Sequence, residues 1–138
     1  MIVYAIRKFL DYFVAKIDLE LEEKALKILN EKEQDIYFNM DYYDRYHGLS
    51  VYAKLIDENM PEIYLKLAIL HDCGKEHANF IIRTMHKIGI KTRLREHSYN
   101  GYKKLKNIDE NLANLILNHH NKTDDTYMKI FQKADDNS

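Results

Sequence analysis

Cysteine, proline and glycine are scarce in this chain, and tryptophan is absent. The 138 residues include one cysteine, one proline and four glycines. A lone Cys73 excludes an internal disulfide, which suits the cytoplasm, and gives no support to a metal site made of cysteines. So few prolines and glycines leave little material for the turns of a β-rich fold.

Net charge and long apolar runs are lacking as well. The formal net charge is −1, which argues against binding to long nucleic acid or to acidic membranes. No apolar run approaches the roughly 18 to 20 residues that a membrane span needs. Arg7, Lys8, Asp11 and Lys16 interrupt the apolar N-terminus, so we interpret it as an amphipathic helix and not as a signal peptide. We expect a cytoplasmic protein.

What is present is a globular composition with helical periodicity. Hydrophobic residues make up 46% of the chain and charged residues 31%, and the length suits one domain, residues 1–138, with its own core. Apolar residues recur at helical spacing, which predicts an all-α fold of about seven to nine helices. The expected helices cover residues 2–17, 19–29, 31–39, 44–58, 61–72, 77–88, 97–106, 109–120 and 124–136.

The helix that begins near Pro61 is expected to be the central one. Residues 63–70 are apolar almost all round, which is typical of a buried helix. Pro61 suits its first position and Gly74 is placed to cap its end. Earlier in the chain, Asp18 is expected to cap the start of the helix over 19–29.

His71 and Asp72 are the first candidates for chemistry because they close this buried helix. Consecutive helical residues are about 100° apart, so both side chains can reach one ion beyond the helix end. The negative end of the helix dipole favours a cation there. Burial of this pair without partners is costly, and metal coordination removes that cost. A histidine that is hydrogen-bonded to a core carboxylate is the alternative for an isolated pair.

Other polar residues fall on inward helix faces. His47 shares a stripe with Val51 and Leu55, and His97 opens a later helix in which Gly101 permits close backbone approach. Imidazole and carboxylate ligands suit iron, manganese, zinc or nickel.

Two choices between neighbours arise near the end of the chain. Asp135 aligns with Phe131 and Met128 on an inward face, whereas Asp136 aligns with Lys129 and Gln132, so Asp135 is the better ligand candidate. His119 and His120 straddle the inward face of the helix over 109–120, and periodicity alone does not choose between them. His77 and His86 lack comparable placement, and we interpret them as surface or rim residues.

Five segments carry these residues in chain order: YHGLSVYAKL, LAILHDCGK, EHSYNGYKKL, LILNHHN and FQKADDNS. Together they resemble the HD-domain superfamily of metal-dependent phosphohydrolases, with its pattern H…HD…H…H…D. The match covers roughly residues 44–136. The likeness is greatest to small bacterial stand-alone HD proteins of the HDIG type, with Cys73 in place of the usual isoleucine. It implies a compact helical bundle in which residues 44–136 form the metal-site core and helices of residues 1–43 pack on it.

The resemblance implies a ligand set for one or two divalent ions. His47, His71, Asp72 and Asp135 match the four ligands of the first metal in the family. The ions expected are iron, manganese, nickel, zinc or magnesium.

Further histidines match the second ion of dinuclear members, in which the aspartate matched by Asp72 bridges both ions. His97 and His119 match the additional histidines of these members. The family spacing from an apolar residue, here Ile116 to His119, selects His119. His120 resembles the second histidine of the HD-GYP branch, where it can assist metal binding.

The reaction implied is hydrolysis of a phosphate ester, in a small molecule such as a nucleotide or a phosphodiester. Asp72 and Lys75 are the residues expected to act in catalysis, with Lys75 neutralising phosphate charge; the alternative for Lys75 is a solvated lysine near a helix end. Arg93 and Arg95 precede His97 and are interpreted as a charged loop.

Departures from the family pattern keep other functions open. The segment NKTDD follows His120 in place of the Gly-Tyr-Pro run of cyclic-dinucleotide phosphodiesterases, and Gly74-Lys75 stands where alarmone hydrolases have Glu-Asp. A di-iron oxygenase of the HD superfamily would use the same six ligands. A non-catalytic metal- or nucleotide-binding module is the other alternative, because little of the sequence follows Asp135. The oligomeric state does not follow from the sequence.

Overall fold

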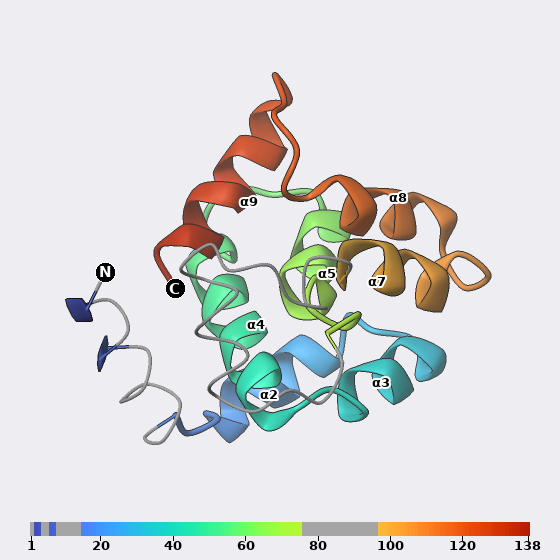
Figure 1. Cartoon of the computed structure of the whole chain (residues 1–138). Helices are drawn as coiled ribbons and strands as arrows, with labels where there is room; N and C mark the ends of the chain where they lie inside the picture. The colour runs from blue at the N-terminus through green and yellow to red at the C-terminus, as the bar shows by residue number, and fades with distance from the viewer. Residues whose placement is uncertain (1, 4–5, 8–14, 76–96) are drawn as a thin grey trace.

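The fold is helical throughout the part of the chain that the structure describes. This computed structural model describes residues 2–3, 6–7, 15–75 and 97–138. Seven helices lie in these ranges and no strand does (Figure 1), which confirms the predicted all-α class. The expected helix over 77–88 and most of that over 2–17 lie outside the described residues. The helices are α2 (Leu19–Leu26), α3 (Glu31–Phe38), α4 (Tyr42–Leu55), α5 (Glu62–Leu70), α7 (His97–Leu105), α8 (Glu110–Asn118) and α9 (Thr126–Asp136).

Polar side chains at the N-caps explain where four of these helices begin. The carboxylate of Asp18 accepts hydrogen bonds from two backbone N–H groups at the start of α2, which confirms the predicted cap. Asn30 and Glu33 form a reciprocal capping box at the start of α3. Asp109 and Asp125 accept backbone hydrogen bonds at the starts of α8 and α9. Each cap satisfies N–H groups that have no partner within the helix.

Helix α5 is the central helix, as its apolar sequence predicts. It contacts α3, α4, α8 and α9, and residues 67–70 are completely buried. The helix begins at Glu62. Pro61 is therefore the N-cap residue and not the first residue of the helix, which is where the sequence placed it. Because α2 contacts α4 and α3 contacts α5, the described helices of residues 1–43 pack against the helices that follow. None of the helices in the described ranges combines the length and apolarity that a membrane span requires.

The prediction that Gly74 caps α5 is wrong. Helix α5 ends at Leu70 with His71 as its C-cap, and Gly74 does not adopt the left-handed conformation of a capping glycine. Instead, a Cβ atom at Gly74 would overlap the backbone oxygen of His97 and the backbone nitrogen of Gly101. Gly74 therefore lets the turn after α5 approach the first turn of α7. The close backbone approach expected at Gly101 is confirmed, because the backbone that lies against Gly101 is that of Gly74.

Candidate metal centre

Two buried histidines, His71 and His119, stand at the C-caps of α5 and α8 in the same arrangement. Each Nδ1 atom faces the carbonyl oxygen three residues earlier: Ala68 at 2.9 Å for His71, and Ile116 for His119. This contact places the hydrogen on Nδ1 and leaves a lone pair on Nε2 in the neutral ring. The Nε2 atom of His119 has no hydrogen-bond partner among the described residues, and that of His71 faces carboxylate oxygens. Metal-ligating histidines are oriented in this way, so both rings fit the role of ligands.

The first cluster consists of His47, His71, Asp72 and Asp135. The Nε2 atom of His47 lies 2.7 Å from Oδ1 of Asp135, and Nε2 of His71 lies 3.1 Å from the same oxygen. The Nε2 atom of His71 also lies 3.3 Å from Oδ2 of Asp72. Adjacent ligand atoms on one ion are about 3.0–3.4 Å apart when each bond is near 2.1 Å. The two contacts of His71 therefore have the spacing of ligands around one ion.

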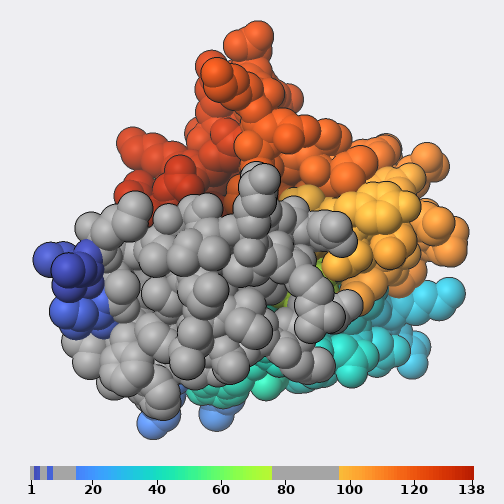
Figure 2. Space-filling model, in the orientation of Figure 1, coloured from blue at the N-terminus to red at the C-terminus, as the bar shows by residue number. Residues whose placement is uncertain are grey.

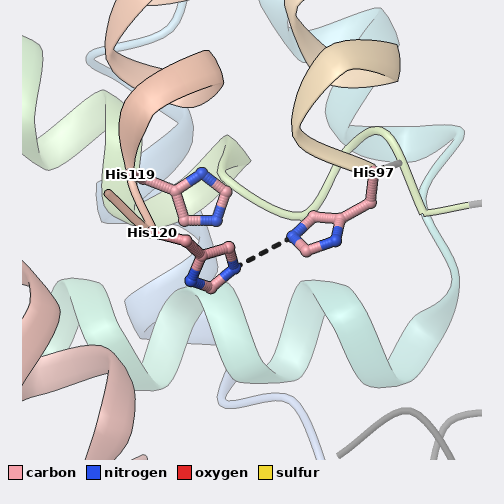
Figure 3. A group of neighbouring side chains, drawn as sticks. All are labelled: His97, His119 and His120. Carbon is pink, nitrogen blue, oxygen red and sulfur yellow. Dashed lines mark hydrogen bonds between the residues drawn. The ribbon is translucent and has the colours of Figure 1, made fainter. Parts of the chain in front are cut away.

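The second cluster consists of three histidines, His97, His119 and His120. Figure 3 shows His97 at the start of α7 facing His119 and His120 at the end of α8. Their nearest ring nitrogens all lie within 4.8 Å of one another. The Nε2 atoms of His97 and His120 are 3.2 Å apart, again the spacing of two ligands on one ion. The side chain of His119 is completely buried, whereas His120 is exposed overall.

Asp72 stands between the two clusters and offers one carboxylate oxygen to each. Its Oδ2 atom faces the first cluster, 3.3 Å from Nε2 of His71 and 3.9 Å from Nε2 of His47. Its Oδ1 atom lies 3.5 Å from Nε2 of His97 in the second cluster. A carboxylate held in this way can bind two cations at once, one through each oxygen.

Lys75 is an ion-pair partner of the shared carboxylate. Its Nζ atom lies 3.3 Å from Oδ2 of Asp72, and its side chain is only 8% exposed. The alternative of a solvated lysine at a helix end therefore does not describe its position. The ammonium brings a positive charge to the edge of the first cluster.

Comparison with protein families agrees with this geometry. The model of the HD-domain family matches residues 38–136, more than two thirds of the chain. The chain belongs to the HD-domain family. HD domains are typically metal-dependent hydrolases that bind divalent ions, and the histidine and aspartate clusters are groups that can hold such ions. No curated protein and no solved structure matches the chain.

The charges within the first cluster of this HD domain balance one another. Burial alone would lower the pKa of His71, but the carboxylates of Asp72 and Asp135 outweigh it and raise the pKa to about 10. Burial would raise the pKa values of both carboxyl groups, but the charge of His71 holds the pKa of each well below its usual range, with help from Lys75 at Asp72 and from the hydrogen bond of His47 at Asp135. His71 must therefore lose a proton before its Nε2 atom can act as a ligand.

His47 and His119 have the opposite preference, for the neutral ring. Burial lowers the pKa of His47, although its hydrogen bond to Asp135 partly offsets this. Burial lowers the pKa of His119 well below its usual range, and the positive charges of His71 and His120 lower it further. Neutral imidazole is the form that binds metal ions, so these two histidines need no deprotonation near neutral pH.

The side chains of Phe131 and Cys73 are buried beside the candidate ligands. The ring of Phe131 lies 5.2 Å from the ring of His71 and 6.1 Å from that of His119, measured between centroids, with an edge-to-face arrangement in both pairs. Burial raises the pKa of the Cys73 thiol to about 12, so this thiol stays protonated and is a packing group.

The structure brings together every described residue that was singled out as a ligand. Asp136 is exposed, as its helix face predicts. His77, His86, Arg93 and Arg95 lie outside the described residues. Sequence reasoning missed two polar side chains that support the clusters. These are Lys104, which donates to the carbonyl oxygen of Cys73 at 2.7 Å, and Gln132, which binds carbonyl oxygens at the end of α8.

Proposed function

We propose that this HD domain hydrolyses a phosphate ester, in a nucleotide or another small phosphodiester, with the help of one or two divalent ions. The observation that carries the proposal is the position of Asp72, whose two carboxylate oxygens face two separate groups of imidazole nitrogens. A mononuclear structural site has no use for such a shared carboxylate. Two-ion hydrolysis does, because it needs two cations close together.

Each cluster has a defined part in this proposal. His47, His71, Asp72 and Asp135 would hold the first ion. His97 and His119 would hold the second ion together with Asp72, and His120 would add a further nitrogen on the side of His97. A bound divalent ion would lower the pKa of a coordinated water from 15.7, to about 7 in the most effective sites, and would thereby make hydroxide available near neutral pH.

Lys75 serves the substrate. Its ammonium lies beside the shared carboxylate, which supports the proposal that it contacts an anionic phosphoryl group of the substrate. A charge-assisted hydrogen bond to phosphate orients the ester and offsets the negative charge that develops during hydrolysis. The carboxyl groups of Asp72 and Asp135 stay ionised, so Lys75 also limits their repulsion of the phosphate.

The test combines metal analysis with a substrate screen. The full chain is assayed for metal content after purification, then incubated with nucleotides and phosphodiesters in the presence of Mn²⁺, Fe²⁺, Ni²⁺, Zn²⁺ or Mg²⁺, with and without oxygen. We expect phosphate release that depends on the metal and is independent of oxygen. Asp72→Asn preserves the size of the side chain and should abolish both metal retention and turnover. Asp57→Asn, at an exposed aspartate in the turn after α4, is the matched control.

Three outcomes contradict the proposal. Turnover that requires oxygen and iron identifies a di-iron oxygenase. Stoichiometric metal and nucleotide binding without turnover across the panel identifies a binding module. Full activity in Asp72→Asn shows that the reaction occurs elsewhere on the chain.

A further inference from the structure

The side chain of Gln132 on α9 joins that helix to the end of α8. Its Nε2 atom lies 3.0 Å from the carbonyl oxygen of His119 and 2.8 Å from that of Asn121. Both partners are carbonyl oxygens, which only accept hydrogen bonds, so the amide nitrogen must face them and donate one N–H to each. Gln132 thereby satisfies two backbone groups on either side of His120.

These two hydrogen bonds act where α8 has ended and the chain leaves the body of the molecule. The chain between α8 and α9 and the beginning of α9 form the projection at the top of Figure 2, and most residues from 121 to 127 are exposed. His119 and His120 therefore lie where this exposed segment begins. The hydrogen bonds from Gln132 hold the backbone of both histidines against a helix that is packed on α4 and α5.

The same helix also supplies the first cluster. Asp135 lies one turn beyond Gln132 on α9, and its Oδ1 atom contacts both His47 and His71. Phe131, the neighbour of Gln132, packs against His71 and His119. One turn of α9 thus contacts both clusters. Gln132 makes the polar contact to the second cluster, through the backbone of His119.

We propose that Gln132 is a positioning residue that sets the second cluster, so that the chain binds a second ion more tightly when this amide holds the backbone of His119 and Asn121. The inference rests on the two-ion form of the proposed function. It adds a residue that touches neither ion nor substrate and acts through the backbone of His119 and His120. Outer partners of this kind change metal affinity by about 10- to 100-fold when they are removed.

A second glutamine provides a matched control. The Nε2 atom of Gln34 on α3 donates to the carbonyl oxygens of Leu26 and Leu29, at 3.0 and 3.1 Å. It makes a similar double contact to the backbone at a helix end, but its partners are the last residue of α2 and a residue of the turn that follows. Replacing Gln34 therefore removes an equivalent structural contact without touching the residues that bracket His120.

The experiment titrates metal-free full chain with Mn²⁺ alone, followed by calorimetry and by electron paramagnetic resonance, which detects magnetically coupled Mn²⁺ pairs. The wild type should bind two ions in two steps. Gln132→Met retains the volume of the side chain but has no donor, and its second step should weaken about 10-fold or more, with loss of the coupled signal. The first step should change less than about twofold. Gln34→Met should keep both steps and the coupled signal.

A second variant separates the loss of the amide donors from a change in charge. Gln132→Glu retains the size of the side chain and loses the donors, and its added negative charge would by itself tighten cation binding. A weaker second step in this variant therefore supports the inference. An unchanged or tighter second step in either Gln132 variant overturns it, as does equal weakening of both steps. A single binding step in the wild type removes the two-ion proposal itself, whereas two intact steps in every variant remove only the role of Gln132.

Discussion

The Nε2 atom of His47 lies 2.7 Å from Oδ1 of Asp135, although 88 positions separate the two residues in the chain. His47 comes from the middle of α4 and Asp135 from the last turn of α9. The end of α9 is held in place by Lys54 of α4, since its Nζ atom donates to the side chain of Ser138 at 2.7 Å and to the carbonyl oxygen of Asn137. The late carboxylate is thus anchored to the same helix as its histidine partner.

This contact predicts that Asp135 and its neighbour Asp136 differ sharply in metal binding. Asp135→Asn removes the anionic oxygen shared by His47 and His71, so metal affinity at the first cluster should fall at least about 10-fold. Asp136→Asn changes an exposed side chain on the outer face of α9 and should bind metal as the wild type does. Calorimetric titration of the metal-free proteins measures both. Equal affinities in the two variants would exclude Asp135 as a ligand.

Lys75 is expected to affect metal binding and turnover in opposite directions. Lys75→Met removes a cation that lies 3.3 Å from Oδ2 of Asp72, so metal ions should bind at least as tightly as in the wild type. Loss of a charge-assisted contact to phosphate should lower kcat/KM by about 10-fold or more. Lys106→Met, at an exposed lysine beyond α7, serves as the control. Weaker metal binding in Lys75→Met would instead indicate that this lysine holds Asp72 in place.

Gly48 is expected to tolerate no larger residue, because α4 lies directly on α5 at this point. A Cβ atom at position 48 would lie 2.5 Å from the carbonyl oxygen of Ile69, a backbone atom that cannot rotate away. Gly48→Ala should therefore lower the free energy of unfolding by about 1–3 kcal/mol, despite the better helix propensity of alanine. At Gly101 the nearest atom is the side-chain Cγ2 of Ile116, at 2.8 Å, so Gly101→Ala should cost less. Urea denaturation measures both, and the reverse order would contradict this account.

The raised pKa of the Tyr37 hydroxyl group leads us to expect a loss of stability at alkaline pH that is independent of the metal centre. Burial and the hydrogen bond from its hydroxyl group to Glu22, at 2.6 Å, raise the pKa of Tyr37 far above its ordinary value of 10.0. The folded chain keeps this proton above pH 10, where the unfolded chain releases it. The stabilisation is therefore complete below pH 10 and declines above it, by about 1.4 kcal/mol per pH unit.

Tyr37→Phe lacks this proton and tests the prediction directly. Its free energy of unfolding should decline less steeply with pH above 10 than that of the wild type, even if it is lower at neutral pH through loss of the hydrogen bond. Other buried tyrosines titrate in both proteins and cancel in the comparison. Parallel curves for the two proteins would show that Tyr37 ionises normally.

Much of the fold could be predicted from the sequence because its signals are local. The apolar run over 63–70 predicts a buried helix, and α5 is the central helix in the structure. Asp18 predicts a helix start through hydrogen bonds to residues two and three positions away. The end of α5 was misjudged because Gly74 has two possible uses, a left-handed cap or a close approach. Only the presence of α7 against it decides for the second.

The sequence by itself determined which residue types were available and on which helix faces they lie, since these depend on spacing along one chain. His71, Asp72 and Asp135 were candidates on that ground alone. Tertiary structure decided which atoms meet: that Asp72 turns one oxygen to His71 and the other to His97, that His119 and His120 share a cluster with His97, and that Gln132, placed by periodicity on an outward face, reaches back to α8. These relationships depend on how helices far apart in sequence cross and approach, and packing across the whole core sets that geometry.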